Sequence, residues 1–213
     1  MSKFPPELPE PPLTRRERLR RVIRLCTSFT RNLAFHRAGM AKEPQLTLLT
    51  PPHPHCAFWR EAHGNFYDMC VLEWCKLFAD LKGEHHWKNI VADSTAFEAE
   101  MLAHVGITAD EFAAHIKKMK HYRDKFVAHL DSDRKMELPF FETAHKAVAF
   151  YHEYIATKGA AAGDLTGLPD AAWKLAKGYQ QCFEEAESVY RHAMTFSPEA
   201  QHEIGVSLSR RFS

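Results

Sequence analysis

Between residues 109 and 130 the side chains that form one helix face recur at regular spacing, and this feature constrains the fold most. They follow one another at steps of four, three, four, three and four residues: Phe112, Ile116, Met119, Arg123, Phe126 and Leu130. Thr108 followed by Glu111 is the capping-box arrangement that begins a helix. The pattern therefore predicts a helix over 109–130 with one buried face.

Similar patterns, bounded by glycine and proline, occur along most of the chain. They predict helices over five further ranges: 14–38, 57–81, 95–104, 139–157 and 169–196. Three glycines are expected at helix ends: Gly39, Gly106 and Gly159. No convincing strand pair is present, and 45% hydrophobic residues are enough for a core. We therefore expect an all-α bundle of five or six helices.

The predicted bundle is one domain between two tails. Residues 1–13 are rich in proline and are expected to form an extended, disordered tail. Residues 14–196 form the helical domain, and residues 197–213 form a weakly patterned C-terminal tail.

Charge is distributed unevenly along the chain. Residues 1–42 contain ten Lys or Arg and three Glu, a net charge of +7, whereas the whole chain carries +1. Six arginines, which we call the basic arm, lie close together at the start of the first helix: Arg15, Arg16, Arg18, Arg20, Arg21 and Arg24. The arm either binds a polyanion such as RNA or docks on the acidic remainder of its own chain.

Several classes of protein and site are disfavoured. The five cysteines are odd in number and form no CxxC pair, which is typical of a reduced, cytoplasmic protein. No apolar run is long enough to span a membrane, and no signal peptide is recognisable. No phosphate-binding glycine motif occurs, and the histidine clusters at 53–56 and 84–86 lack the paired spacing of a zinc site. We expect no cofactor and no metal.

Arg123 is the unusual member of the predicted apolar face. A buried, unpaired guanidinium costs several kcal/mol, so the side chain needs a partner. One hypothesis is a structural ion pair with a carboxylate of a neighbouring helix, for which Asp68, Glu73 and Glu98 are candidates. The other is an anionic ligand in a cleft or subunit interface, because the arginine fork binds phosphate with two parallel hydrogen bonds.

His129 lies about 120° from Arg123 around an ideal helix. It shares a flank of the predicted helix with Lys118, Tyr122 and Lys125. This flank is cationic and able to form hydrogen bonds. A histidine there is able to act as a general acid or base.

The segment RDKFVAH, from Arg123 to His129, resembles the signature of the HEPN superfamily: an arginine, a polar residue, a few variable residues and a histidine. The sequence of this segment is most similar to AbiU-type abortive-infection proteins. LEWCKLF at 72–78 and HHWKNIV at 85–91 are also similar to that branch, so the resemblance covers roughly 56–155.

The resemblance implies an all-α, metal-independent endoribonuclease of a toxin–antitoxin or phage-defence system, with a composite site made by two protomers. Arg123 would hold the scissile phosphate and His129 would transfer a proton. Asp124 would orient one of them, and the product would be a 2′,3′-cyclic phosphate. A homodimer, an RNA substrate and a cognate antitoxin are the partners implied, and Lys118, Tyr122 and Lys125 would bind the RNA. Because many members have lost activity, the alternative is a non-catalytic interaction module in which Arg123 forms a structural ion pair.

Spacing alone does not identify the working pair, because Arg31 and His36 also match it, with Asn32 as the polar residue. The two candidate pairs differ in the helix face on which the arginine is expected to lie. Arg31 is expected on the polar side of its helix, where an arginine needs no explanation, whereas Arg123 stands where arginine is costly. We therefore favour Arg123 with His129.

Overall fold

The computed structural model describes residues 12–41, 47–49, 53, 55–127, 137–167 and 174–194. Every regular element in these residues is helical, which confirms the predicted all-α class. Seven α-helices are present in the described part of the chain: α1 (Arg15–Met40), α3 (Cys56–Phe78), α4 (Trp87–Ile90), α5 (Ser94–Val105), α6 (Ala109–Tyr122), α7 (Phe141–Ala161) and α8 (Leu175–Met194). A 3₁₀ turn, η1 (Thr47–Leu49), and a π-helical turn, η2 (Arg123–Val127), complete the set.

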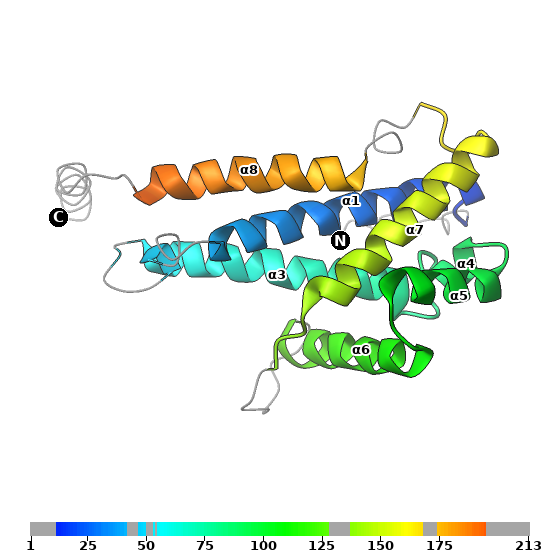
Figure 1. The fold of residues 1–213 in the computed structure, drawn as a ribbon, viewed down its shortest axis with the longest axis horizontal. Helices are drawn as coiled ribbons and strands as arrows, with labels where there is room; N and C mark the ends of the chain where they lie inside the picture. Colours follow the sequence, from blue (N-terminus) through cyan, green and yellow to red (C-terminus); the bar gives the residue numbers. More distant parts are fainter. Residues whose placement is uncertain are drawn as a thin grey trace, which may run out of the picture.

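Helix α1 is the centre of the bundle. It packs between α3 and α8, and the three long helices lie side by side, while α7 crosses them obliquely (Figure 1). Helix α5 packs on α7, and α6 packs on α3 at the edge of the bundle. One hydrophobic core joins α1, α3, α5, α6 and α7, and its largest fully buried side chains include Trp74, Trp87 and Tyr151.

Local chemistry explains where the helices begin and end. The predicted capping box of Thr108 and Glu111 is present at α6, and Thr14 forms a second capping box with Glu17 at α1. Each places a side-chain oxygen on a backbone N–H that has no partner within the helix. Gly106 ends α5 with φ +80°, the left-handed conformation that favours glycine.

Several predicted boundaries were wrong. Gly39 does not end α1 but lies buried in its last turn, where an added Cβ would stand 2.8 Å from the Tyr190 ring and 2.9 Å from His63 Nδ1. This glycine therefore permits a close approach of α3 and α8 to α1. Gly159 likewise lies inside α7, and Pro139 precedes α7 by two residues instead of occupying its first turn. Residues 1–11, Pro169 and the predicted C-terminal tail lie outside the described residues.

Two further differences concern helix type. Helix α4 was missed, because four residues are too few to show periodicity. The helix predicted over 109–130 changes character at Arg123, where α6 gives way to the π-helical turn η2. Both differences lie in segments on which the HEPN resemblance rests.

Candidate functional site

Helix α6 fixes the position of the motif against α3. Its buried residues are Phe112 and Met119, which lie on the predicted apolar face, and Tyr122, which was predicted on the neighbouring flank. Tyr122 is only 5% exposed, and its hydroxyl donates to Asp68 at 2.8 Å. Burial and this hydrogen bond raise the pKa of Tyr122. The tyrosine therefore belongs to the α3–α6 interface, although its spacing had placed it on the cationic flank of the helix.

Arg123 is held by two carboxylates. Its Nη1 donates to Asp80 at 2.5 Å and its Nε donates to Asp124 at 2.8 Å, and the side chain is 17% exposed. Burial alone would lower the pKa of Arg123, but the hydrogen bonds to Asp80 and Asp124 raise it above its ordinary value. The guanidinium is thus permanently charged and fastens η2 to the residues that follow α3.

The prediction that Asp68, Glu73 or Glu98 pairs with Arg123 was wrong. Asp68 accepts from Tyr122, Glu73 accepts from Asn32 on α1 at 3.3 Å, and Glu98 lies 4.0 Å from Lys88. Asp80 stands just beyond the end of α3, within the range 57–81 that was predicted to be helical.

The electrostatics around Arg123 are not those of an open phosphate site. One guanidinium faces two carboxylates, Asp80 and Asp124, so these three groups carry a net negative charge. Cys75 lies nearby, and burial raises the pKa of its thiol to about 12. An arginine has five N–H groups, so the two carboxylates do not by themselves exhaust its capacity to donate.

Asp124 makes the contact with Arg123 that its predicted orienting role requires, and its side chain is 49% exposed. Lys125 is half-buried in the same turn. His129 lies outside the described residues.

Lys118 lies on another part of α6 and faces a cavity of about 730 Å³ between α6 and the entry to α7. The cavity is lined on the α6 side by basic and imidazole side chains: His115, Lys117, Lys118 and His121. Phe140 and Leu138 line the opposite side and are 90% and 53% exposed. Burial and the charge of Lys118 lower the pKa of His115 to about 4. Arg123 is not among the lining residues, so the structure does not bring Arg123 and Lys118 into one cavity.

The weaker candidate pair is not brought together either. Arg31 is exposed on α1, as expected, and interacts with Cys182 of α8. His36 instead stacks on His63 of α3, with ring centroids 4.1 Å apart. Burial, followed by His63, lowers the pKa of His36 to about 4, so this imidazole is neutral at pH 7.

Part of the basic arm contacts the protein's own fold. Arg15 donates to the Ile90 carbonyl at 3.3 Å and lies 3.5 Å from Asp164. Arg16 donates to the Thr166 carbonyl at 2.9 Å. These contacts support docking of the arm on its own domain for two of its six arginines.

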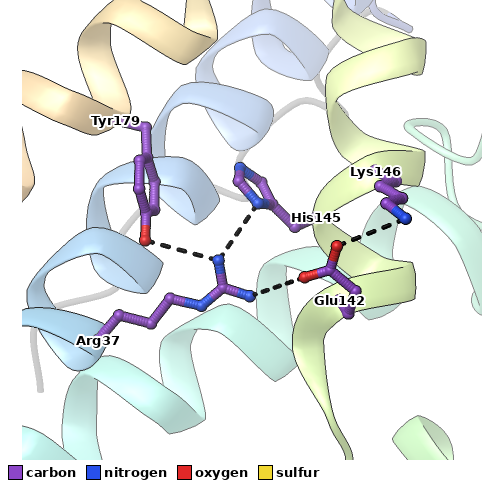
Figure 2. Close-up of polar contacts among 5 residues, drawn as sticks. All are labelled: Arg37, Glu142, His145, Lys146 and Tyr179. Carbon is purple, nitrogen blue, oxygen red and sulfur yellow. Dashed lines mark hydrogen bonds and ion pairs between the residues drawn. The ribbon is translucent and has the colours of Figure 1, made fainter. Parts of the chain in front are cut away.

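One polar cluster was not anticipated from the sequence. Arg37 near the end of α1 reaches His145 and Glu142 of α7 and Tyr179 of α8 (Figure 2). Lys146 lies 3.5 Å from the same Glu142 carboxylate. These residues are separated by up to 142 positions, and no motif links them.

Within the part of the chain that the structure describes, no three His, Cys, Asp or Glu side chains come together in a way that could hold a metal ion. No described helix has both the length and the apolar character needed to cross a membrane. Comparison with known proteins gives no further assignment, since no family model, curated protein or solved structure matches the chain.

Proposed function

We propose that this chain is a HEPN-like endoribonuclease that needs no metal ion and uses Arg123, Asp124 and His129. One observation carries the proposal: the five residues Arg123–Val127 of the motif form a π-helical turn. Such turns are rare inside helices and occur frequently at functional sites. The resemblance and the local distortion therefore fall on the same residues.

In the proposed reaction Arg123 stabilises the scissile phosphate of an RNA strand, and Asp124 keeps its guanidinium in a fixed orientation. His129 transfers the proton of the 2′-hydroxyl or of the leaving oxygen, which yields a 2′,3′-cyclic phosphate. Lys118 and Lys125 neutralise neighbouring phosphates along the strand. The proposal includes a cytoplasmic homodimer with α6 near its axis, and a cognate antitoxin as the regulating partner.

The second candidate is an interaction module without catalysis. It is favoured by the pairing of Arg123 with both Asp80 and Asp124, because these carboxylates neutralise the positive charge with which the arginine would bind a phosphate. Under this hypothesis the arginine serves the α3–η2 junction alone.

Three variants separate the two functions, with fluorescently labelled single-stranded RNA as the substrate and EDTA present. For a nuclease, His129→Ala leaves the melting temperature unchanged. It abolishes cleavage, because general acid–base catalysis contributes about 10²–10⁴ in rate. Arg123→Ala loses both activity and stability. Exposed His104 of α5 provides the control, and His104→Ala should cleave as the wild type does.

Asp80→Asn tests the ion pair between Asp80 and Arg123. If Arg123 acts on phosphate, removing one competing carboxylate leaves cleavage by the folded fraction intact or raises it. Cleavage by His129→Ala at the wild-type rate would refute the assignment of His129. Wild-type protein that binds RNA but cuts none, across substrates of varied sequence, would favour the interaction module.

A further inference from the structure

The cluster around Arg37 joins three helices that are distant in sequence. Arg37 comes from the last turn of α1, Glu142 and His145 from the first two turns of α7, and Tyr179 from α8. Their polar ends point toward one another (Figure 2). The cluster is separate from Arg123 and does not depend on RNA cleavage.

The hydrogen-bond distances from Arg37 to the three side chains that the structure describes around it are all long. Its Nη1 lies 3.5 Å from His145 Nδ1 and 3.5 Å from the Tyr179 hydroxyl, and its Nη2 lies 3.5 Å from Glu142. Charge-assisted hydrogen bonds of this type ordinarily measure about 2.7–2.9 Å. The Arg37 side chain is 33% exposed and that of Glu142 is 67% exposed, so their ion pair is weak and open to exchange with a solute.

The cluster is rich in donors and has an excess of positive charge. Arg37 and Lys146 are cationic, and only Glu142 among the five side chains is anionic. An arginine only donates, so the His145 Nδ1 that faces it accepts, and the ring is neutral. The Tyr179 oxygen accepts from Arg37, which leaves its own hydrogen to donate.

We propose that Arg37, Tyr179 and Lys146 form a binding site for a phosphate group, with Glu142 occupying the place of the anion when the site is empty. A phosphate would receive two parallel hydrogen bonds from the Arg37 fork, which is a stronger arrangement than the single long contact with Glu142. Lys146 lies one turn further along α7, and its ammonium has three donors, so it is able to contact the displaced carboxylate and the phosphate together.

A purely structural role for Arg37 predicts the opposite effect of one substitution. If Glu142 merely ties α7 to α1, Glu142→Gln only weakens the bundle. If Glu142 competes with an anion, the same change strengthens anion binding.

The test is isothermal titration of the full-length chain with inorganic phosphate at constant ionic strength. Arg37→Met should weaken phosphate binding by about tenfold or more, the factor expected for losing one charge-assisted hydrogen bond. Glu142→Gln should tighten binding, and Arg37→Lys should be intermediate because lysine lacks the fork. Arg191→Met, which removes an exposed arginine from α8, is the matched control and should bind as the wild type does.

Titration of single-stranded RNA into the wild type and Arg37→Met identifies the source of the phosphate. Weaker RNA binding by Arg37→Met assigns the phosphate to an RNA backbone, whereas unchanged RNA binding assigns it to a free phosphate monoester. The proposal is overturned if the wild type shows no saturable phosphate binding, if Arg37→Met binds phosphate as the wild type does, or if Glu142→Gln binds it more weakly.

Discussion

The ion pair between Arg123 and Asp80 should stabilise the fold measurably, and a double-mutant cycle isolates its contribution. The two side chains are 17% and 35% exposed, so the pair is intermediate between surface and buried pairs. Surface pairs contribute about 0.2–1 kcal/mol, and removing one partner of a buried pair costs about 3–5 kcal/mol. Because Asp80 is able to regain water and Asp124 remains beside Arg123, we expect a coupling free energy of about 1–1.5 kcal/mol.

The individual variants should rank in a defined order. Arg123→Ala should lose about 2 kcal/mol, since it removes both contacts and part of the packing on α3. Asp80→Ala should lose less, because Asp124 still neutralises the guanidinium. Urea unfolding followed by circular dichroism at 222 nm measures each free energy of unfolding.

Lys88 and Glu98 provide the control cycle, because their charged groups are 4.0 Å apart and 45% and 39% exposed. Their coupling should stay below about 0.5 kcal/mol. A coupling between Arg123 and Asp80 no larger than that of the control pair would refute the view that this contact fastens η2 to α3.

Three further predictions follow from the core. Gly39→Ala should destabilise the protein by about 1–3 kcal/mol in urea unfolding through overcrowding by Tyr190. Gly64→Ala should be neutral or stabilising, because beyond the adjoining backbone of its own helix nothing lies within 4 Å of the added carbon. The pKa of His36 is lowered by burial to about 4 in the folded state, so the unfolded chain takes up a proton first as the pH falls. His36 alone should therefore reduce stability by up to about 3 kcal/mol between about pH 6.5 and 4, and His36→Gln should flatten this part of the profile. In thiol labelling under native conditions Cys56 should react fastest, because it is half-buried whereas Cys75 is buried with a pKa near 12; equal rates for the two would contradict the burial.

Helices that have strong periodicity and clear capping residues were predicted from the sequence, because those signals are local. Thr108, Glu111 and Gly106 behave as expected because a cap depends on residues within one turn. Gly39 was misread, because its reason for being glycine lies in Tyr190 and His63, which come from other helices.

The candidate site was predicted less well for the same reason. Periodicity identified Arg123 as a residue that needs a partner, but only the fold selects Asp80 over Asp68 and Glu73. An ideal-helix projection also placed Tyr122 on the wrong side, because that residue packs into the α3–α6 interface just before the helix turns π-helical. The group around Arg37 carries no sequence signal at all, as its members meet only through tertiary packing.

The position of α1 has a consequence for how the chain acquires its structure. Among the described helices α1 is synthesised first, yet it packs against α8, which is synthesised last. The face of α1 that α8 covers thus stays exposed to water, or to any other apolar surface, until residue 194 has left the ribosome. Completion of this three-helix layer is therefore a late, long-range event, and aggregation or chaperone binding during synthesis should begin at this face.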